Sequence, residues 1–218
     1  AFRQYEQTEE YQHKKTLADA WCAAFAIRKH FNEPGLERSV SGITQGLLNR
    51  WASHSVPPRE DPLLDEVQRL SSAHQFFHWH LAFPDVFAKG GFDVVLANPP
   101  WVSYTGRQKA EISASSLRLL LGRFPSVTRW PATHPALLVL SAQLLAASGR
   151  AGLVLPKQVA ELPAYGPSRA EVSSIAKLAA PVVDVGEHSF PGVTQPVGLF
   201  SLIACRDAGP KSDVPWPC

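Results

Sequence analysis

The sequence contains no methionine, and only three of its 218 residues are cysteines. Cys22, Cys205 and Cys218 lie far apart and lack the paired spacing that is typical of a zinc site or of a disulfide framework. Such sparse cysteines fit a reducing cytoplasm. A natural reading frame starts with methionine, whereas this sequence starts with Ala1, so we expect the chain to be part of a longer protein.

Long apolar runs and a strong charge imbalance are also missing. No apolar run approaches the ~20 residues that a membrane helix needs, and the sequence shows no secretory leader, so we expect no membrane partner. The net charge is +2 at pH 7, and the chain is 45% hydrophobic and 18% charged, as in an ordinary globular domain. Local clusters of charge therefore carry more information about partners than the total does.

Residues 1–75 are predicted to form a helical segment. Apolar side chains recur there at three- and four-residue spacing, with turn signals at residues 32–35 and 55–62 and a new helix from Leu63. His74 and His78 have the spacing of a shared ligand face on a helix, but no acidic or cysteine partner lies at a suitable spacing. We therefore expect no metal site.

The most informative stretch is residues 91–101, which read Gly-Phe-Asp-Val-Val-Leu-Ala-Asn-Pro-Pro-Trp. The apolar run from Phe92 to Ala97 is typical of a strand in a parallel sheet that is covered on both faces. Pro99 has no backbone donor, so the strand must end there, and Asn98 is held extended by the proline that follows it. The stretch predicts a rigid corner at the carboxyl end of a strand, where open α/β sheets bind ligands.

This corner offers the groups that would activate the exocyclic amino group of adenine. The Asn98 side-chain oxygen and the Pro99 carbonyl would accept both amino hydrogens and localise the nitrogen lone pair for attack on a methyl sulfonium. Trp101 would stack on a base swung out of the duplex. The ordinary alternative is a strand followed by a proline-rich turn without chemistry.

The stretch resembles the catalytic motif of the amino-methylating DNA methyltransferases, Asn/Asp-Pro-Pro-Tyr/Phe/Trp. The segment from Phe76 to Phe87 and the Gly-Gly-Phe-Asp at residues 90–93 are similar to the lead into that motif in large adenine-specific methylases of bacterial restriction-modification and phage-defence systems. The resemblance implies an α/β, Rossmann-like sheet, S-adenosylmethionine as cofactor and double-stranded DNA as partner, with other subunits of such a system as candidate partners. Its implied catalytic residues are Asn98, Pro99, Pro100 and Trp101.

After this motif the charges are almost all positive, and they would contact DNA phosphates, although scattered surface arginines would give the same pattern. Tyr104 follows the corner and is a substrate-binding candidate. The basic residues are Arg107, Lys109, Arg118, Arg123, Arg129 and Arg150, against Glu111 alone.

The rest of the chain predicts two further helix and strand units. A helix over residues 134–148 and a glycine turn lead into a strand at 153–156, which places Lys157 at the same edge as Asn98. A helix from about Ser168 to Leu178 precedes strands at 182–185 and 197–204. By the resemblance, Phe190 in Phe-Pro-Gly-Val is a second stacking residue and Lys157 a substrate-binding one; an ordinary buried loop phenylalanine is the alternative for Phe190.

One element of the family pattern is missing. We find no Phe-x-Gly-x-Gly turn after a first strand and no acidic residue about 20 positions beyond it. In the family the cofactor half precedes the catalytic motif, so we expect the main cofactor site upstream of Ala1 and an inactive isolated chain. The predicted organisation is a helical segment at 1–75, the catalytic half of a methyltransferase domain at 76–206 and a linker or tail at 207–218.

Two other functions stay open. The chain would serve as a non-catalytic DNA-binding remnant or subunit of a defence complex, since the cofactor motif is missing. Alternatively, Asn-Pro-Pro followed by an aromatic residue also occurs in protein glutamine methyltransferases, which methylate a side-chain amide.

Overall fold

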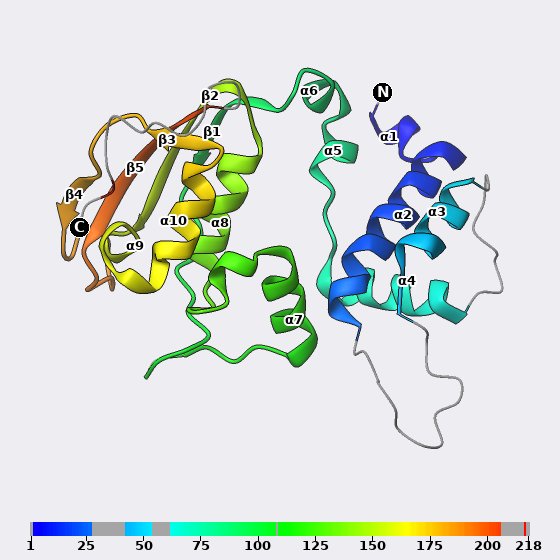
Figure 1. Ribbon diagram of the computed structural model, residues 1–218, viewed down its shortest axis with the longest axis horizontal. Coiled ribbons are helices and arrows are strands. Elements are labelled where there is room, and N and C mark those ends of the chain that lie inside the picture. Colours follow the sequence, from blue (N-terminus) through cyan, green and yellow to red (C-terminus); the bar gives the residue numbers. More distant parts are fainter. Residues whose placement is uncertain (1, 28–41, 54–61, 108, 206–215, 217–218) are drawn as a thin grey trace. The chain divides into compact units, whose positions relative to one another are not determined.

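The computed structural model describes residues 2–27, 42–53, 62–107, 109–205 and 216. The chain divides into two compact units: Ala1–Pro84 with Ser113–Arg123, and Asp85–Ile112 with Phe124–Cys218 (Figure 1). The turn predicted at residues 32–35, nearly all of the one at 55–62, and all of the predicted tail except Trp216 lie outside the described residues.

The first unit is helical, as the sequence predicts for the described part of this region. The N-cap of α2 is Thr8, whose hydroxyl oxygen accepts a hydrogen bond from the Tyr11 N–H at 3.2 Å. Its core packs small residues of α2, such as Ala20 and Ala23, against larger ones such as Trp51 and Val67. No described helix is both long and apolar enough to cross a membrane. The helices are α1 (Phe2–Tyr5), α2 (Glu9–Ala26), α3 (Gln45–Ser53), α4 (Pro62–His74), α5 (Trp79–Ala82) and α7 (Ala114–Arg123).

A buried carboxylate, that of Asp19, links α2 to the segment that contains His78. Asp19 is only 6% exposed, and its two oxygens lie 2.6 Å from His78 Nε2 and 2.6 Å from Lys15 Nζ. Burial raises the pKa of Asp19, but hydrogen bonds from His78, Lys15 and Ser71 outweigh it and hold that pKa below its ordinary value. No local pattern indicates this partner for His78, which lies 59 residues away. Among the described residues no group of three or more side chains is arranged to hold a metal ion.

The second unit is a mixed sheet with helices, which confirms the predicted α/β class. Its strands are ordered β1-β2-β5-β3, and β4 pairs with β5. Among the described strands, β1 and β2 pair in parallel, and the pairings of β5 with β2, β3 and β4 are antiparallel. The strands are β1 (Phe92–Ala97), β2 (Leu145–Pro156), β3 (Ala176–Leu178), β4 (Val183–Gly186) and β5 (Val197–Ala204). The helices are α6 (Pro84–Ala88), α8 (Thr133–Gln143), α9 (Gln158–Glu161) and α10 (Gly166–Ser173), with 3-10 turns at Pro125–Val127 and Pro163–Tyr165.

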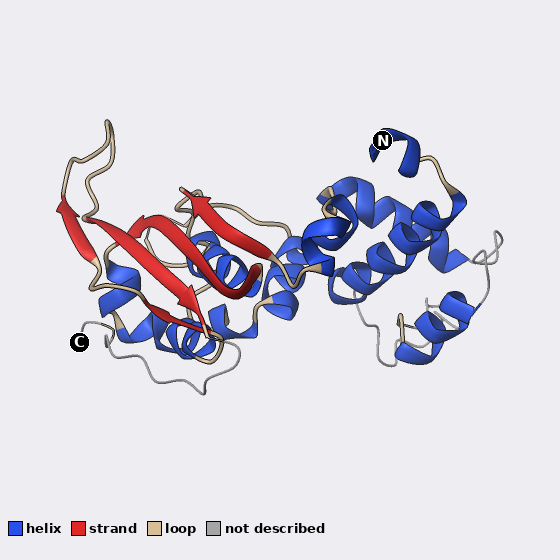
Figure 2. Ribbon diagram, turned by 90° about the horizontal axis from the view of Figure 1, so that it is seen from above, coloured by secondary structure: helices blue, strands red, loops and turns tan. Residues whose placement is uncertain are grey.

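The two faces of the sheet differ within this unit. Helices lie along one face of the sheet (Figure 2), and α8 and α10 are among them (Figure 1). Buried side chains of these helices, such as Leu138 and Val172, pack with Leu153 and Leu202 of the sheet. The prediction that both faces of β1 are covered is wrong for the described residues of this unit, because Leu96 is 79% exposed. Leu96 lies on the face opposite α8 and α10, where Leu199 of the inner strand β5 is also exposed.

Two predicted helix ends are also wrong. The helix predicted over residues 134–148 ends at Gln143, and β2 already begins at Leu145, because this apolar run pairs with β1. The predicted glycine turn is instead an irregularity inside β2, where the register with β1 shifts and Ser148 has a φ of 65°. Similarly, α10 ends at Ser173, and residues expected to continue it form β3.

Gly91 fixes the start of β1. Its φ is +129°, and a Cβ on this residue would lie 2.5 Å from the Leu144 carbonyl oxygen. That oxygen accepts the first ladder hydrogen bond of β1, from the Phe92 N–H at 2.9 Å. The close approach of the two backbones therefore requires glycine.

We expect Gly91→Ala to lower the free energy of unfolding of the sheet unit by about 1–3 kcal/mol, because the new methyl group overlaps backbone atoms that cannot move aside. Urea unfolding measures the change. Gly90→Ala is the matched control, since Gly90 also has a positive φ of 95° but a Cβ there meets nothing within 4 Å. Equal losses in the two variants would show that the strained φ, and not the contact with Leu144, decides the effect.

A buried histidine lies in the first turn of α8. His134 is 4% exposed, its Nε2 lies 3.1 Å from the Tyr165 hydroxyl, and its Nδ1 has no hydrogen-bond partner among the described residues. Burial lowers the pKa of His134 to about 4. Burial also raises the pKa of the Tyr165 hydroxyl, so both groups are neutral at pH 7.

Unfolding should therefore become easier as the pH falls. Histidine in an unfolded chain has a pKa of about 6.5, so between pH 6.5 and 4 the unfolded state binds a proton that the folded state excludes. We expect His134 to cost about 2 kcal/mol of stability between pH 7 and pH 5, at about 1.4 kcal/mol per pH unit below 6.5. Urea unfolding at both pH values, with His134→Gln as comparison, measures this cost. An equally steep pH dependence in the variant would assign it to other groups.

Candidate functional site

The sequence-predicted site residues gather at one edge of the sheet. β1 and β2 run parallel, with Ala97 opposite Leu153, so Asn98 and Lys157 both follow the carboxyl end of a strand. β5 runs antiparallel to β2, with Val197 opposite Pro156, so the loop between β4 and β5 returns to this same edge and brings Phe190 there. The topology therefore places all the predicted residues in the second unit: Asn98, Pro99, Pro100, Trp101, Tyr104, Lys157 and Phe190.

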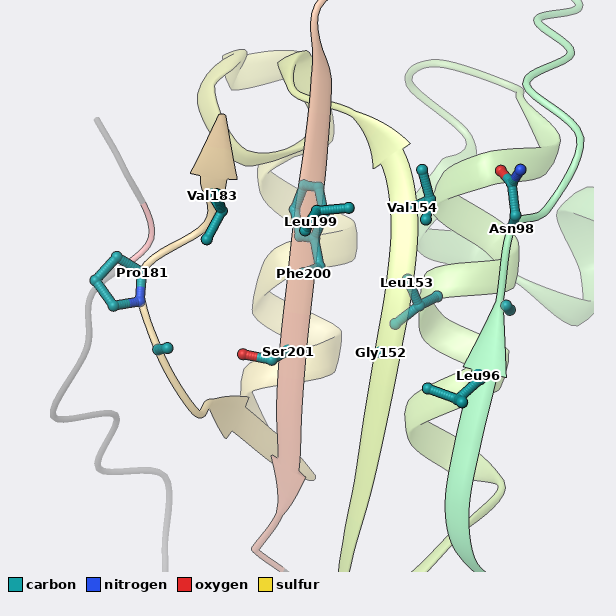
Figure 3. Close-up of a pocket in the computed structure, with 12 residues that line it drawn as sticks. Leu96, Asn98, Gly152, Leu153, Val154, Pro181, Val183, Leu199, Phe200 and Ser201 are labelled. Carbon is teal, nitrogen blue, oxygen red and sulfur yellow. The ribbon is translucent and has the colours of Figure 1, made fainter. Parts of the chain in front are cut away.

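Asn98 is available to a ligand. Its side chain is exposed, and its amide makes no hydrogen bond to any other described residue. It lies at the end of β1 beside a cavity of about 560 Å³ on the face of the sheet opposite α8 and α10 (Figure 3). The next residue, Pro99, is buried and anchors the chain beneath this amide.

The walls of this cavity are mostly apolar. They consist of outward side chains and backbone from β1, β2, β4 and β5, including Leu96, Gly152, Val183 and Leu199. The polar side chains among the lining residues are those of Asn98 and Ser201. A flat, uncharged ligand group that needs one or two hydrogen-bond acceptors fits such a surface better than a charged one does.

The same lining does not fit a complete site for S-adenosylmethionine. That cofactor carries ribose hydroxyls, which Rossmann-like sheets bind with a carboxylate, and its binding turn is rich in glycine. No acidic side chain lines the cavity, and no strand in the described part of the chain is followed by closely spaced glycines. The lining of this cavity therefore does not form a complete S-adenosylmethionine site.

Trp101 is fixed against the neighbouring strand. Its indole Nε1 donates a hydrogen bond to the Val154 carbonyl oxygen at 3.2 Å, and the ring is half-buried. Val154 lies one residue beyond the last β1–β2 pair, Ala97 with Leu153. The indole thus binds β2 just where β1 has ended, which holds its ring at the edge of the sheet. Stacking on a base stays a prediction.

A second segment holds the chain after the prolines. The Tyr104 N–H donates to the Pro131 carbonyl at 2.9 Å, and the Thr133 N–H donates to the Val102 carbonyl at 2.9 Å. The Thr133 hydroxyl donates to the Pro100 carbonyl and accepts from the Val102 N–H at 3.1 Å. Sequence reasoning missed Thr133; the available signal was a threonine directly before the helix predicted from His134.

Lys157 and Phe190 are placed differently. Lys157 Nζ lies 2.9 Å from Asp184 Oδ2 and 3.0 Å from Glu161 Oε1, and hydrogen bonds to these carboxylates raise its pKa. A DNA phosphate would therefore have to compete with two carboxylates for Lys157. The Phe190 ring is 39% exposed, which does not match the alternative of an ordinary buried phenylalanine.

The basic residues that the sequence predicts as a cluster belong to both units. Arg118 and Arg123 belong to α7 in the helical unit, where the Arg118 guanidinium donates to the Ala26 carbonyl at 2.9 and 3.2 Å. The other basic residues belong to the sheet unit and are exposed: Arg107, Lys109, Arg129 and Arg150. That these basic residues contact DNA phosphates stays a prediction.

Comparison with known proteins gives one family. The family model described as Eco57I restriction-modification methylase matches residues 11–172, which include the corner, α8 and β2. No curated protein matches the chain. The match covers most of the 218 residues, and the mixed α/β sheet agrees with a methylase domain. The chain therefore belongs to the Eco57I restriction-modification methylase family, a family of DNA methyltransferases.

Proposed function

We propose that the sheet unit is the acceptor half of an adenine-specific DNA methyltransferase in a restriction-modification or phage-defence system. In this function it binds the exocyclic amino group of an adenine that has swung out of the duplex. Family membership supports methyl transfer to DNA, and methylases of this kind typically use S-adenosylmethionine as donor. The observation that carries the finer proposal is the exposed Asn98 amide, which has no partner among the described residues and borders the cavity.

Methylation of an adenine amino group needs hydrogen-bond acceptors for that group and does not need a strong base. The lone pair of an adenine amino group is delocalised into the ring, which makes the nitrogen a poor nucleophile. Asn98 Oδ1 and the Pro99 carbonyl oxygen each accept a hydrogen bond from the amino group. These bonds favour a tetrahedral nitrogen with a localised lone pair. Because both acceptors are held in place before the substrate arrives, they act by positioning and by electrostatic stabilisation. The cofactor supplies an electrophilic methyl group.

The surroundings suit a planar base. The cavity volume of about 560 Å³ lies within the ~300–1,000 Å³ range of ligand pockets. Trp101 and Phe190 offer aromatic faces at the same edge, and stacking on such faces contributes about 1–3 kcal/mol per base in single-strand binders. Tyr104, which follows the fixed indole, and Lys157 complete the proposed substrate-binding set.

One alternative has an observation in its favour. Since the described residues do not form a cofactor cradle, a subunit that binds DNA without methylating it is consistent with the same corner. Protein glutamine methylation would use the same pair of acceptors on a side-chain amide, but the family match supports DNA as substrate.

We expect Asn98→Ala to lower the methylation rate by about 10²–10³-fold, because one of two acceptors for the amino group is lost. Methyl incorporation into duplex DNA by the protein that carries this chain measures the rate. DNA affinity, measured by fluorescence anisotropy, should change little, since phosphate contacts dominate it. Asn49→Ala is the matched control, because Asn49 lies exposed on α3 in the other unit.

Asn98→Asp separates the role of the acceptor from that of the amide. It keeps a side-chain oxygen at the same position and should retain far more activity than Asn98→Ala. Unchanged methylation by Asn98→Ala would refute the assigned role. A wild-type protein that raises the fluorescence of 2-aminopurine placed at the target base, yet transfers no methyl group with S-adenosylmethionine present, would favour the non-catalytic alternative.

A further inference from the structure

The corner after β1 has few backbone groups that can hold it. Pro99 and Pro100 have no backbone N–H, so neither can donate a hydrogen bond to a neighbouring segment. In the proposed function, the Pro99 carbonyl must stay free for the substrate. Beyond Pro99, the structure holds the corner through the Pro100 carbonyl and through the N–H and carbonyl of Val102.

All three of these groups contact one side chain. The Thr133 hydroxyl donates to the Pro100 carbonyl oxygen, accepts from the Val102 N–H at 3.1 Å, and lies 3.3 Å from the Val102 carbonyl oxygen. The other links between the segments, such as Thr133 N–H to Val102 and Tyr104 N–H to Pro131, use backbone atoms only. Thr133 thus contributes side-chain hydrogen bonds that hold this segment, in addition to the bond of the Trp101 indole to Val154.

We infer that Thr133 is a positioning residue for methyl transfer, acting through the Asn98-Pro99-Pro100-Trp101 corner; this inference rests on the proposed function. Each proline ring fixes φ, so the remaining backbone freedom of the corner is mainly in the ψ angles. β1 fixes the chain up to Ala97, so anchoring the Pro100 carbonyl and the Val102 N–H limits the ψ angles of Asn98 and Pro99, which lie between these two anchors. That restriction keeps the Pro99 carbonyl and the Asn98 amide at the spacing that two amino hydrogens of one nitrogen require.

Thr133 is itself held in place. It is the first residue of α8, and the residues after it, from His134 to Ala136, are buried in the unit. α8 packs on β2 and α10, so the hydroxyl is attached to the packed core of the unit. The corner is therefore connected to the core through an oxygen whose own position is fixed by packing, as a positioning residue needs.

The test compares variants that keep or remove the hydroxyl, in the protein that carries this chain and methylates DNA. Thr133→Val keeps the shape of the side chain and loses the hydroxyl, so we expect kcat to fall by about 10–100-fold, the cost of a misplaced reacting group. KM for DNA should stay within about threefold, because phosphate contacts are unchanged. Thr133→Ser keeps the hydroxyl and should restore kcat to within about threefold of wild type.

Thr128→Val is the matched control. The Thr128 hydroxyl also donates to a backbone carbonyl, that of Pro125 at 2.6 Å, but this bond lies within an exposed local turn and does not involve the corner. This variant should keep the wild-type kcat. If Thr133→Val does not fold, the comparison of Thr133→Ser with Thr133→Ala decides in its place, with the serine variant expected to be the faster by about tenfold or more.

Several results would overturn the inference. A wild-type kcat in Thr133→Val would do so, as would equal losses in Thr133→Ser and Thr133→Val, since the hydroxyl would then be irrelevant. A loss expressed only in KM would place Thr133 in DNA binding instead. Asn98→Ala distinguishes a failure of this inference from a failure of the proposed function. If Asn98→Ala is inactive and Thr133→Val has normal activity, only the role of Thr133 is contradicted. If Asn98→Ala is active, the proposed function itself is contradicted.

Discussion

Two consecutive prolines cannot donate backbone hydrogen bonds, and this constraint shapes the whole edge of the sheet. The ladder between β1 and β2 stops at the pair of Ala97 and Leu153, although β2 continues to Pro156. The chain must leave the sheet plane at that point. Its next contacts come from side chains, the Trp101 indole on Val154 and the Thr133 hydroxyl on Pro100. The same constraint that ends the strand therefore exposes the Asn98 amide and leaves its acceptor oxygen unused by the described protein.

Among the described elements of this unit, helices cover one face of the sheet and not the other, and this difference determines the surroundings of the Asn98 side-chain oxygen. α8 and α10 bury one face, whereas the other face of this unit presents outward side chains such as Leu96 and Leu199 around the cavity. A hydrogen bond to Asn98 in such apolar surroundings is stronger than one in water once a ligand excludes solvent. Apolar walls also favour the flat ring of a nucleotide's base over the charged phosphates of the nucleic-acid backbone. The cavity therefore combines apolar walls with the polar side chains of Asn98 and Ser201. In the proposed function, this combination would orient a base.

Sequence patterns predicted the two strands whose ends carry local signals. β1 and β5 have the predicted bounds: β1 lies between Gly91 and Asn98-Pro99, and β5 follows Pro196 and ends shortly before the polar residues Arg206 and Asp207 of the sequence. The predicted start of β2 was wrong since its leucine- and alanine-rich beginning has the composition of a helix, and only pairing with β1 makes it a strand. The exposure of Leu96 had no local signal either, because the covering of a strand depends on which elements pack on each face of the sheet. Likewise, the buried pair of His78 and Asp19 could not be predicted from the sequence, because the two residues are 59 positions apart.

In the candidate site, too, some residues can be predicted from a local motif, whereas others are distant in the sequence and cannot. The groups that would touch the substrate are consecutive, so a motif of four residues from Asn98 to Trp101 is enough to predict their chemistry. The groups that hold them come from elsewhere: Val154 on β2 and Thr133 at the start of α8, 31 residues after Val102. A backbone corner without donors cannot hold itself, so its geometry depends on these distant partners. An identical motif on a chain that lacks them would keep the acceptor atoms but lose their fixed spacing, and catalysis by positioning depends on that spacing.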